Sequence, residues 1–196
     1  MTNYTPKNRG MGFALYLCNT KAKLAANRTI NKNLVVCPDY IGVFIMIETK
    51  RIKLYPTSRE QMEKIIAAEP CEALKVAYSE MLEGCLQHID EWEWYAMWNI
   101  ELNNGTRVGD LCFKGLDSRG VVEIGYGILE EYQGQGYATE AVKAVTEWAL
   151  QKNNVTAIEA ETDVDNIISQ KVLSKCGFIA NGVIGEEGPR FVLTRG

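Results

Sequence analysis

The alternation of apolar and polar residues becomes regular only after residue 45. The stretch 1–45 follows neither a helical nor a strand period and is rich in Asn, Lys and Thr. Residues 47–54 then predict a strand, and Thr57-Ser58-Arg59-Glu60 predicts a capping box that opens a helix through Ala68. A second helix is expected after Pro70 and ends near Cys85.

Strands joined by short turns are predicted in the middle of the chain, at residues 94–102, 107–114 and 121–129. Asn103-Asn104-Gly105 is typical of a hairpin turn between the first two, and residues 117–120 supply the next turn. The first two segments are therefore expected to form a hairpin.

The apolar period changes from 2 to 3.6 directly after a glycine-rich stretch. The residues that then share one helical face, with Trp148 at its edge, are Ala138, Ala141, Val142, Val145 and Ala149. A strand at 155–162, a helix at 166–176 and closing strands at 178–184 and 190–194 complete the pattern. The order β-α-α-β-β-β-α-β-α-β-β predicts an α/β (α+β) fold with a mixed, mostly antiparallel central sheet and helices on both faces.

Charge divides the chain at the same place as periodicity does. Residues 1–45 hold six basic residues and one acid, whereas the remainder holds 15 basic and 24 acidic residues, so the net charges are +5 and −9. We therefore expect a poorly structured N-terminal extension, 1–45, and one globular domain, 46–196. Met46 is a candidate start of the native protein. The competing interpretation is a real extension, either a basic arm for an acidic partner or a strand added to the sheet edge by residues 34–45.

Composition excludes several classes of protein. A body of net charge −9 repels phosphate backbones, so nucleic acid is not an expected partner, whereas a cationic amine would be attracted. No apolar run approaches the roughly 20 residues of a membrane span. Six cysteines without a C-x-x-C pair, beside His88 as the only histidine, provide no metal site. Such scattered cysteines, without a secretion signal, predict a cytoplasmic location.

The stretch 133–139, Gln-Gly-Gln-Gly-Tyr-Ala-Thr, lies between a predicted strand and a predicted amphipathic helix. Free backbone N–H groups and the positive end of a helix hold phosphate well, and glycines allow close approach. The stretch lacks the G-K-[ST] of a P-loop, and Thr139 replaces the third glycine of G-x-G-x-x-G. Its other interpretation is an ordinary strand-to-helix turn.

The surrounding string, residues 131–141, resembles the acetyl-CoA loop of the GNAT superfamily of N-acyltransferases. Its pattern Q/R-x-x-G-x-G/A is met by Gln133, Gly136 and Ala138. A second stretch is similar to the family's N-x-x-S…L-x-K-x-G-F helix, from Asn166 through residues 173–178. The opening IETKRIKLYPTSREQ resembles the branch that contains the ribosomal-protein N-terminal acetyltransferases. The resemblance covers residues 46–196, identified as an N-acetyltransferase domain.

The resemblance implies acetyl-CoA as co-substrate. The backbone of residues 134–139 would hold its pyrophosphate, residues 126–128 would pair with the pantetheine arm, and an N–H near Ile128 would bind the thioester oxygen. Asn166 would orient the far end of the cofactor, or alternatively cap the last long helix. The implied cofactor-binding residues are Tyr126, Gly127, Ile128, Gln133, Gly134, Gln135, Gly136, Tyr137, Ala138, Thr139 and Asn166.

A protonated amine cannot attack a carbonyl, so a carboxylate base is expected. Glu123 and Glu161 are the candidates, and each alternatively belongs to a solvated strand face. The family's usual proton donor, a Tyr seven residues after the Asn, is here Leu173. Tyr137 or Ser169 would substitute, or the thiolate leaves unaided.

Residues 88–98 interleave acids with tryptophans and suggest a rim that holds a cation by charge and π-face together. Glu91, Trp92 and Trp94 are the candidate substrate residues, and the alternative is that these aromatics are strand core.

The sequence thus predicts an N-acetyltransferase that moves an acetyl group to a primary amine by direct attack. The alternatives are a non-catalytic acyl-CoA sensor and a structural module of the same fold. Expected partners are a small-molecule amine or a protein N-terminus, without nucleic acid, membrane or metal, and the expected assembly is a monomer or homodimer.

Overall fold

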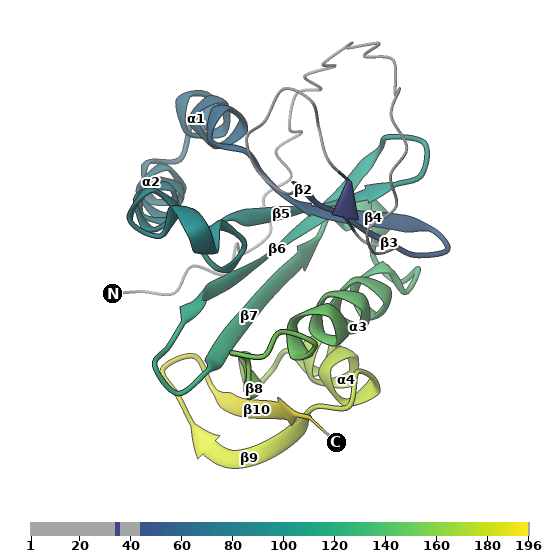
Figure 1. Ribbon diagram of the computed structural model, residues 1–196. Coiled ribbons are helices and arrows are strands. Elements are labelled where there is room, and N and C mark those ends of the chain that lie inside the picture. The colour runs from purple at the N-terminus through teal and green to yellow at the C-terminus, as the bar shows by residue number, and fades with distance from the viewer. Residues whose placement is uncertain (1–33, 36–43, 196) are drawn as a thin grey trace.

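The computed structural model describes residues 34–35 and 44–195 (Figure 1). The helices are α1 (Arg59–Ala68), α2 (Glu72–Gln87), α3 (Tyr137–Leu150) and α4 (Ile167–Lys175), with short 3₁₀ helices η1 (Ile89–Trp94) and η2 (Glu130–Tyr132). The strands are β1 (Leu34–Val35), β2 (Phe44–Ile45), β3 (Ile47–Glu48), β4 (Ile52–Pro56), β5 (Met97–Leu102), β6 (Arg107–Leu116), β7 (Val121–Ile128), β8 (Ala157–Glu161), β9 (Ile179–Ile184) and β10 (Pro189–Thr194).

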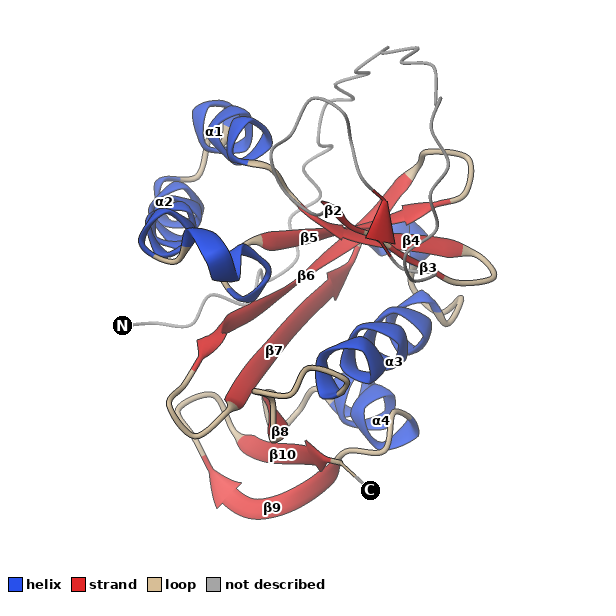
Figure 2. Cartoon of the chain, viewed as in Figure 1, coloured by secondary structure: helices blue, strands red, loops and turns tan. Residues whose placement is uncertain are grey.

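Eight of these strands form one sheet in the order β3-β4-β5-β6-β7-β8-β10-β9. Its neighbours are antiparallel except β7 and β8, which are parallel. Helices α1 and α2 lie on one side of the sheet, and α3 and α4 lie on the other (Figure 2). This arrangement confirms the predicted fold class.

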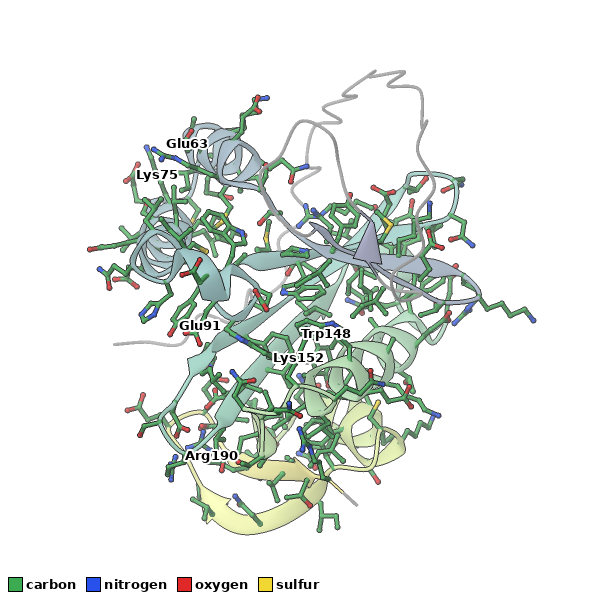
Figure 3. All side chains as sticks on the ribbon, viewed as in Figure 1. Glu63, Lys75, Glu91, Trp148, Lys152 and Arg190 are labelled. Atoms are coloured by element: carbon green, nitrogen blue, oxygen red, sulfur yellow. The ribbon has the colours of Figure 1, made fainter. Side chains whose placement is uncertain are left out.

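An aromatic cluster forms the centre of the core on the α3 side of the sheet. Trp148 of α3 packs against Trp98, with ring centroids 5.0 Å apart, and Trp94 packs against Phe113 at 5.1 Å. Trp148, which Figure 3 labels, is only 5% exposed, so the residue predicted at the edge of the apolar face of the helix lies inside the core. The Trp148 ring packs against one ring each from η1, β5 and β6, and together the four rings exclude water.

The predicted strand at 47–54 is instead the antiparallel hairpin of β3 and β4, in which Ile47 pairs with Leu54. Thr49 explains the turn, because its hydroxyl oxygen accepts hydrogen bonds from the backbone N–H of Arg51 (3.3 Å) and of Ile52 (3.1 Å). Such local side-chain bonds compete with an extended backbone.

The capping box of α1 lies one residue later than predicted. Ser58 Oγ accepts from the N–H of Gln61, and Gln61 Oε1 accepts from the N–H of Ser58 at 2.8 Å. The hydroxyl of Thr57, which the sequence predicted to cap the helix, donates instead to the backbone oxygen of Met97 in β5 at 2.7 Å.

The predicted strand at 94–102 begins later, at Met97. The 3₁₀ helix η1 precedes it, and the indole N–H of Trp98 donates to the backbone oxygen of Glu93 at 2.9 Å. The bond ties the strand to the helix because a buried indole N–H needs an acceptor.

The predicted boundary at residue 46 stays a prediction. Ile45 pairs with Leu34, is 9% exposed and belongs to the main core, so the core of the described residues includes a side chain that precedes Met46. A chain that starts at Met46 is expected to fold with a melting temperature about 2–8 °C below one that starts at Phe44, because it loses one buried isoleucine worth about 1–2 kcal/mol. Thermal unfolding of the two chains measures this, and aggregation of the shorter chain would contradict the boundary.

Candidate active site

The parallel strands β7 and β8 pair only over three residues, from Val121 with Ala157 to Glu123 with Glu159. Beyond Glu123 the remaining length of β7 has no ladder with β8, and this region where the two strands no longer pair is here called the gap. This gap lies in the middle of the sheet, between the β6 side and the β10 side. An extended ligand therefore has a strand edge to pair with.

The direction of the free backbone groups on β7 follows from two hydrogen bonds. Leu129 N–H donates to Val108 O on the β6 side at 2.9 Å, and Thr156 N–H donates to Gly120 O on the β8 side at 2.7 Å. Backbone groups of successive strand residues alternate between the two edges. Tyr126 and Ile128 therefore turn their N–H and C=O groups toward the gap.

The glycine loop follows β7 and ends at the first turn of α3. Gly134 and Gly136 have φ of 72° and 84°, a left-handed conformation that favours glycine. Gln133 ties the loop to β7, since its side-chain amide donates to Ile128 O at 2.9 Å, and Gln135 donates to Glu131 O at 3.2 Å. The two glutamine side chains therefore hold the loop in place through hydrogen bonds to backbone oxygens.

The loop offers a row of open hydrogen-bond donors. Within residues 34–35 and 44–195, no acceptor takes the backbone N–H groups of residues 134–139. Gly136 caps α3 without a side-chain hydrogen bond, and a Cβ at Gly134 would meet no atom within 4 Å. Six open amides at the positive end of a helix fit a pyrophosphate. The predicted residues Tyr137, Ala138 and Thr139 supply three of them.

The start of α4 faces the gap from the α3 side. Asn166 Oδ1 accepts from Ser169 N–H at 3.0 Å. Asn166 therefore caps α4, which was the alternative to its predicted contact with the cofactor. The hydroxyls of Tyr126 and Ser169 are 2.8 Å apart, and burial raises the pKa of Tyr126 to about 12. Leu173, at the family's usual tyrosine position, is fully buried in the core.

The two glutamates predicted as bases meet at Arg190 of β10, which Figure 3 labels. Glu123 uses Oε1 for Lys114 and Oε2 for Arg190. Glu161 Oε2 lies 3.6 Å from Arg190 Nε, and its Oε1 accepts from the N–H groups of Glu187 and, at 3.2 Å, of Gly188. Both oxygens of Glu123 are thus engaged, and Glu161 closes the β9–β10 turn.

Asp110 of β6 is a carboxylate that the sequence interpretation missed. It pairs across the ladder with Gly127, and a Cβ at Gly127 would meet nothing within 4 Å. Asp110 Oδ2 lies 2.7 Å from Arg107 NH2, and the side chain of Asp110 is 40% exposed. Burial raises the pKa of Asp110, opposed by Arg107. An acid at a mid-strand position between Gly109 and Leu111 was the available signal.

The predicted cation rim is divided between surface and interior. Trp94 is 2% exposed in the core, and Trp92 donates its indole N–H to Thr57 O at 2.8 Å. Glu91 remains half-exposed, with Oε2 3.8 Å from His88 Nδ1. The structure therefore keeps Glu91 and part of Trp92 available at the surface, and it places Trp94 with the aromatic core.

The cysteines, possible metal ligands and helix lengths were also part of the sequence-based interpretation. Cys71, Cys85, Cys112 and Cys176 are free thiols, whereas Cys18 and Cys37 lie outside the described residues. Across the part of the chain that the structure describes, no group of His, Cys, Asp or Glu has the arrangement of a metal site. No described helix is long and apolar enough to cross a membrane.

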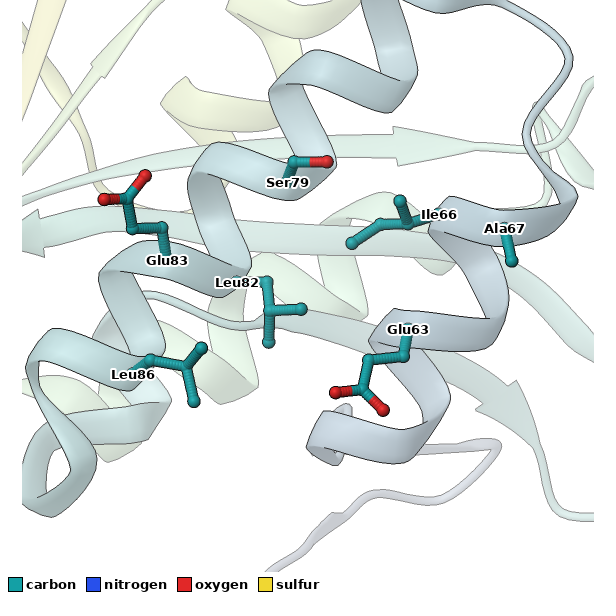
Figure 4. A pocket seen from close by; sticks show the side chains of 7 residues that line it. All are labelled: Glu63, Ile66, Ala67, Ser79, Leu82, Glu83 and Leu86. Atoms are coloured by element: carbon teal, nitrogen blue, oxygen red, sulfur yellow. The ribbon is translucent and has the colours of Figure 1, made fainter.

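A separate surface cavity of about 360 Å³ opens between α1 and α2 (Figure 4). Its lining includes Ile66, Leu82 and Leu86, with Glu63 and Glu83 beside them. None of the predicted site residues lines it, so the cavity is distinct from the gap between β7 and β8.

Two strands that stop pairing beside a glycine loop, with open amides at both, define a protein that can bind an extended, phosphate-bearing ligand. Residues 47–179 match the acetyltransferase (GNAT) domain, and the chain belongs to this family.

The relatives agree with this membership. The chain is 37% identical over 83 residues to the uncharacterized N-acetyltransferase YjdG of Bacillus subtilis, a match of 42% of this chain and 49% of that protein. The chain therefore spans about half of that relative's length.

Two solved structures share the fold. RimL, a ribosomal L7/L12 α-N-protein acetyltransferase, has a TM-score of 0.62 at 15% identity and covers 82% of this chain and 100% of its own. The spermidine N-acetyltransferase of Vibrio cholerae, in complex with CoA and spermine, has a TM-score of 0.58 at 19% identity and covers 74% and 96%. Ribosomal-protein acetyltransferases are thus among the structural neighbours, as the sequence resemblance predicted.

Proposed function

We propose that the protein transfers an acetyl group from acetyl-CoA to a primary amine by direct attack. The observation that carries the proposal is the presence of two neighbouring sets of open donors, the six amides of residues 134–139 and the free edge of β7 at Tyr126 and Ile128. The first set fits the pyrophosphate, and the second fits the amides of a pantetheine arm. Family membership supports acetyl-CoA as the donor.

The transfer forms a C–N bond and breaks a C–S bond. The amine nitrogen attacks the thioester carbon, its proton passes to a carboxylate, and the sulfur leaves as a thiolate that takes up a proton. The N–H of Ile128 faces the gap and would donate to the thioester oxygen as negative charge develops there. Because this donor is backbone, its position is set by the sheet before the substrate arrives.

Three carboxylates on the face opposite α3 compete for the role of base. We propose Glu123, because it is the last β7 residue paired with β8 and stands at the mouth of the gap. An amine would have to displace Lys114 or Arg190 from it. The second candidate is Asp110, which lies opposite Gly127, has a raised pKa, and has an Oδ1 that accepts no hydrogen bond from any described residue. Glu161, with two backbone donors on it, is the third.

The pair Tyr126 and Ser169 is proposed to replace the missing tyrosine as proton donor to the thiolate. Their hydroxyls are 2.8 Å apart at the gap, and a phenol with a pKa of about 12 stays protonated at neutral pH. A thiol with a pKa near 8.5 is also a tolerable leaving group by itself.

The acceptor is proposed to be a small-molecule amine or a protein N-terminus, the two classes named for the structural neighbours. Glu91 and Trp92 are retained as candidate contacts for its positive charge. The assembly is proposed as a monomer or homodimer, and the cytoplasmic location stays a prediction from sequence.

Acetyl-CoA is expected to raise the melting temperature, because a ligand that binds only the folded state adds about 2.7 kcal/mol at 100 times its dissociation constant. Thermal unfolding with and without millimolar acetyl-CoA measures the shift, and thiol release over a panel of amines then measures turnover. An unchanged melting temperature would overturn the proposal. A shift without thiol release for any amine would instead support the acyl-CoA sensor, the function that the buried Leu173 favours.

A further inference from the structure

The turn between β3 and β4 is fastened to the glycine loop by one arginine. Arg51 NH1 donates to the backbone oxygen of Gln135 at 3.0 Å, and Arg51 Nε donates to Glu140 Oε2 at 2.6 Å. The guanidinium carbon also lies 4.6 Å from the centre of the Tyr137 ring. A Cβ at Gly136 would stand 3.5 Å from Arg51 NH2. One side chain therefore contacts Gln135, Tyr137 and Glu140, at the loop and at the start of the helix.

Glu140 makes these contacts electrostatically important. Its carboxylate lies in the first turn of α3, the same turn that offers open amides to a phosphate. Burial raises the pKa of Glu140, but hydrogen bonds from Thr49 and Arg51 outweigh it, so the net shift is downward and the group is ionised at neutral pH. Thr49 Oγ1 donates to Glu140 Oε1 at 2.6 Å.

An ionised carboxylate at this position would repel a bound pyrophosphate. The charge of Arg51 cancels it at a contact of 2.6 Å, with Glu140 19% and Arg51 42% exposed in their side chains. The same guanidinium holds the Gln135 carbonyl, which orients the peptide between the two positive-φ glycines. Neutralisation and orientation thus come from one residue.

We propose that Arg51 is a positioning residue for pyrophosphate binding. It acts by masking the charge of Glu140 and by fixing the Gln135 peptide, and it is not itself the catalytic group. The inference rests on the proposed function, since it needs acetyl-CoA as the ligand of this loop. It adds a role for the β3–β4 turn, which nothing in the glycine motif specifies.

The test is a double-variant cycle of Arg51→Met, Glu140→Gln and the two together, with dissociation constants for acetyl-CoA measured by calorimetry. Arg51→Met is expected to weaken binding about tenfold, because it leaves an unpaired carboxylate beside the phosphates. Glu140→Gln is expected to weaken it less than about threefold. The double variant is expected to bind acetyl-CoA at least about threefold more tightly than Arg51→Met does. Removing the second charge removes the repulsion.

Two further measurements separate positioning from general destabilisation. The KM for S-acetyl-pantetheine, which lacks the pyrophosphate, should be the same for Arg51→Met and the parent, whereas the KM for acetyl-CoA should rise and kcat should change little. Arg119→Met is the matched control, because Arg119 forms a comparable 2.7 Å pair with Asp117 at the opposite end of β7. It should leave both KM values unchanged. Arg51→Lys, which keeps the charge, should bind between the parent and Arg51→Met, and it serves if the methionine variant does not fold.

Additive losses in the cycle, or an equal loss with S-acetyl-pantetheine, would overturn the role of Arg51 while leaving the acetyltransferase proposal intact. Failure of the parent protein itself to bind acetyl-CoA would overturn both.

Discussion

Gly136→Val is expected to abolish the acetyl-CoA-dependent rise in melting temperature and to weaken binding at least about 100-fold. Gly136 has φ of 84° as the N-cap of α3, a conformation that a β-branched residue adopts only with strain. A valine there relaxes the loop away from this conformation and turns its amides from the phosphate. Its side chain also enters the space beside Arg51, 3.5 Å from the position of a Cβ. Calorimetry and thermal unfolding measure both effects.

The matched control is Gly105→Val in the β5–β6 turn. Gly105 has a similar φ of 89°, and a Cβ there would meet nothing within 4 Å. The control therefore carries the same backbone strain without touching the loop. It should lower the melting temperature of the free protein and keep the full acetyl-CoA shift. Normal CoA binding by a folded Gly136→Val variant would mean that the phosphate binds elsewhere.

Removing the base is expected to lower kcat by about 10²- to 10⁴-fold with little change in acetyl-CoA affinity. The comparison is between Glu123→Gln, Glu161→Gln and Asp110→Asn, and the variant with the large loss identifies the base. The loss should shrink as pH rises, because a larger fraction of the amine is then already deprotonated. Glu159→Gln is the control, since Glu159 contacts the same Arg190 at 3.4 Å and is not one of the three candidate bases. It should keep kcat within about threefold of the parent.

The pH dependence distinguishes Asp110 from the glutamates. Burial raises the pKa of Asp110, and a base works only in its deprotonated form, so activity should fall as pH drops through that raised pKa. If Asp110 is the base, the acid limb of kcat/KM lies above the ordinary range of an aspartate, and Asp110→Asn removes this limb. Parent-like kcat in all three variants at neutral pH would leave water alone to take the proton.

Glu161→Gln should differ from the other two in stability. An amide in place of the carboxylate loses the charge that accepts the N–H groups of Glu187 and Gly188, and it turns an NH₂ toward part of the β9–β10 turn. A cost of about 1–3 kcal/mol is expected in the free energy of unfolding. A fall in kcat for this variant is interpretable only after its folded fraction has been measured.

The sequence by itself determined the features that depend on neighbours in the chain. The left-handed glycines of the loop, the free first turn of α3 and the Asn166 cap of α4 each involve residues at most a few positions apart. The order of helices and strands was predicted on the same local basis. The errors arose where two local hydrogen-bonding arrangements compete and the hydrophobic pattern does not show which is more stable. Thr49 forms a turn within a strand-like run, and Ser58 replaces Thr57 as the cap.

Only the tertiary structure decided which distant side chains meet. Arg51 and Glu140 are 89 residues apart, and Glu123 and Arg190 are 67 apart, so their contacts depend on strand order and register. Asp110 faces Gly127 for the same reason, because a shift of one residue in the β6–β7 register would move it to the opposite face. Trp148 became the centre of the core because four rings from separate elements exclude water together. Residue types and their spacing specify the loop that is proposed to bind phosphate, whereas the packing of the sheet specifies the charges that surround it.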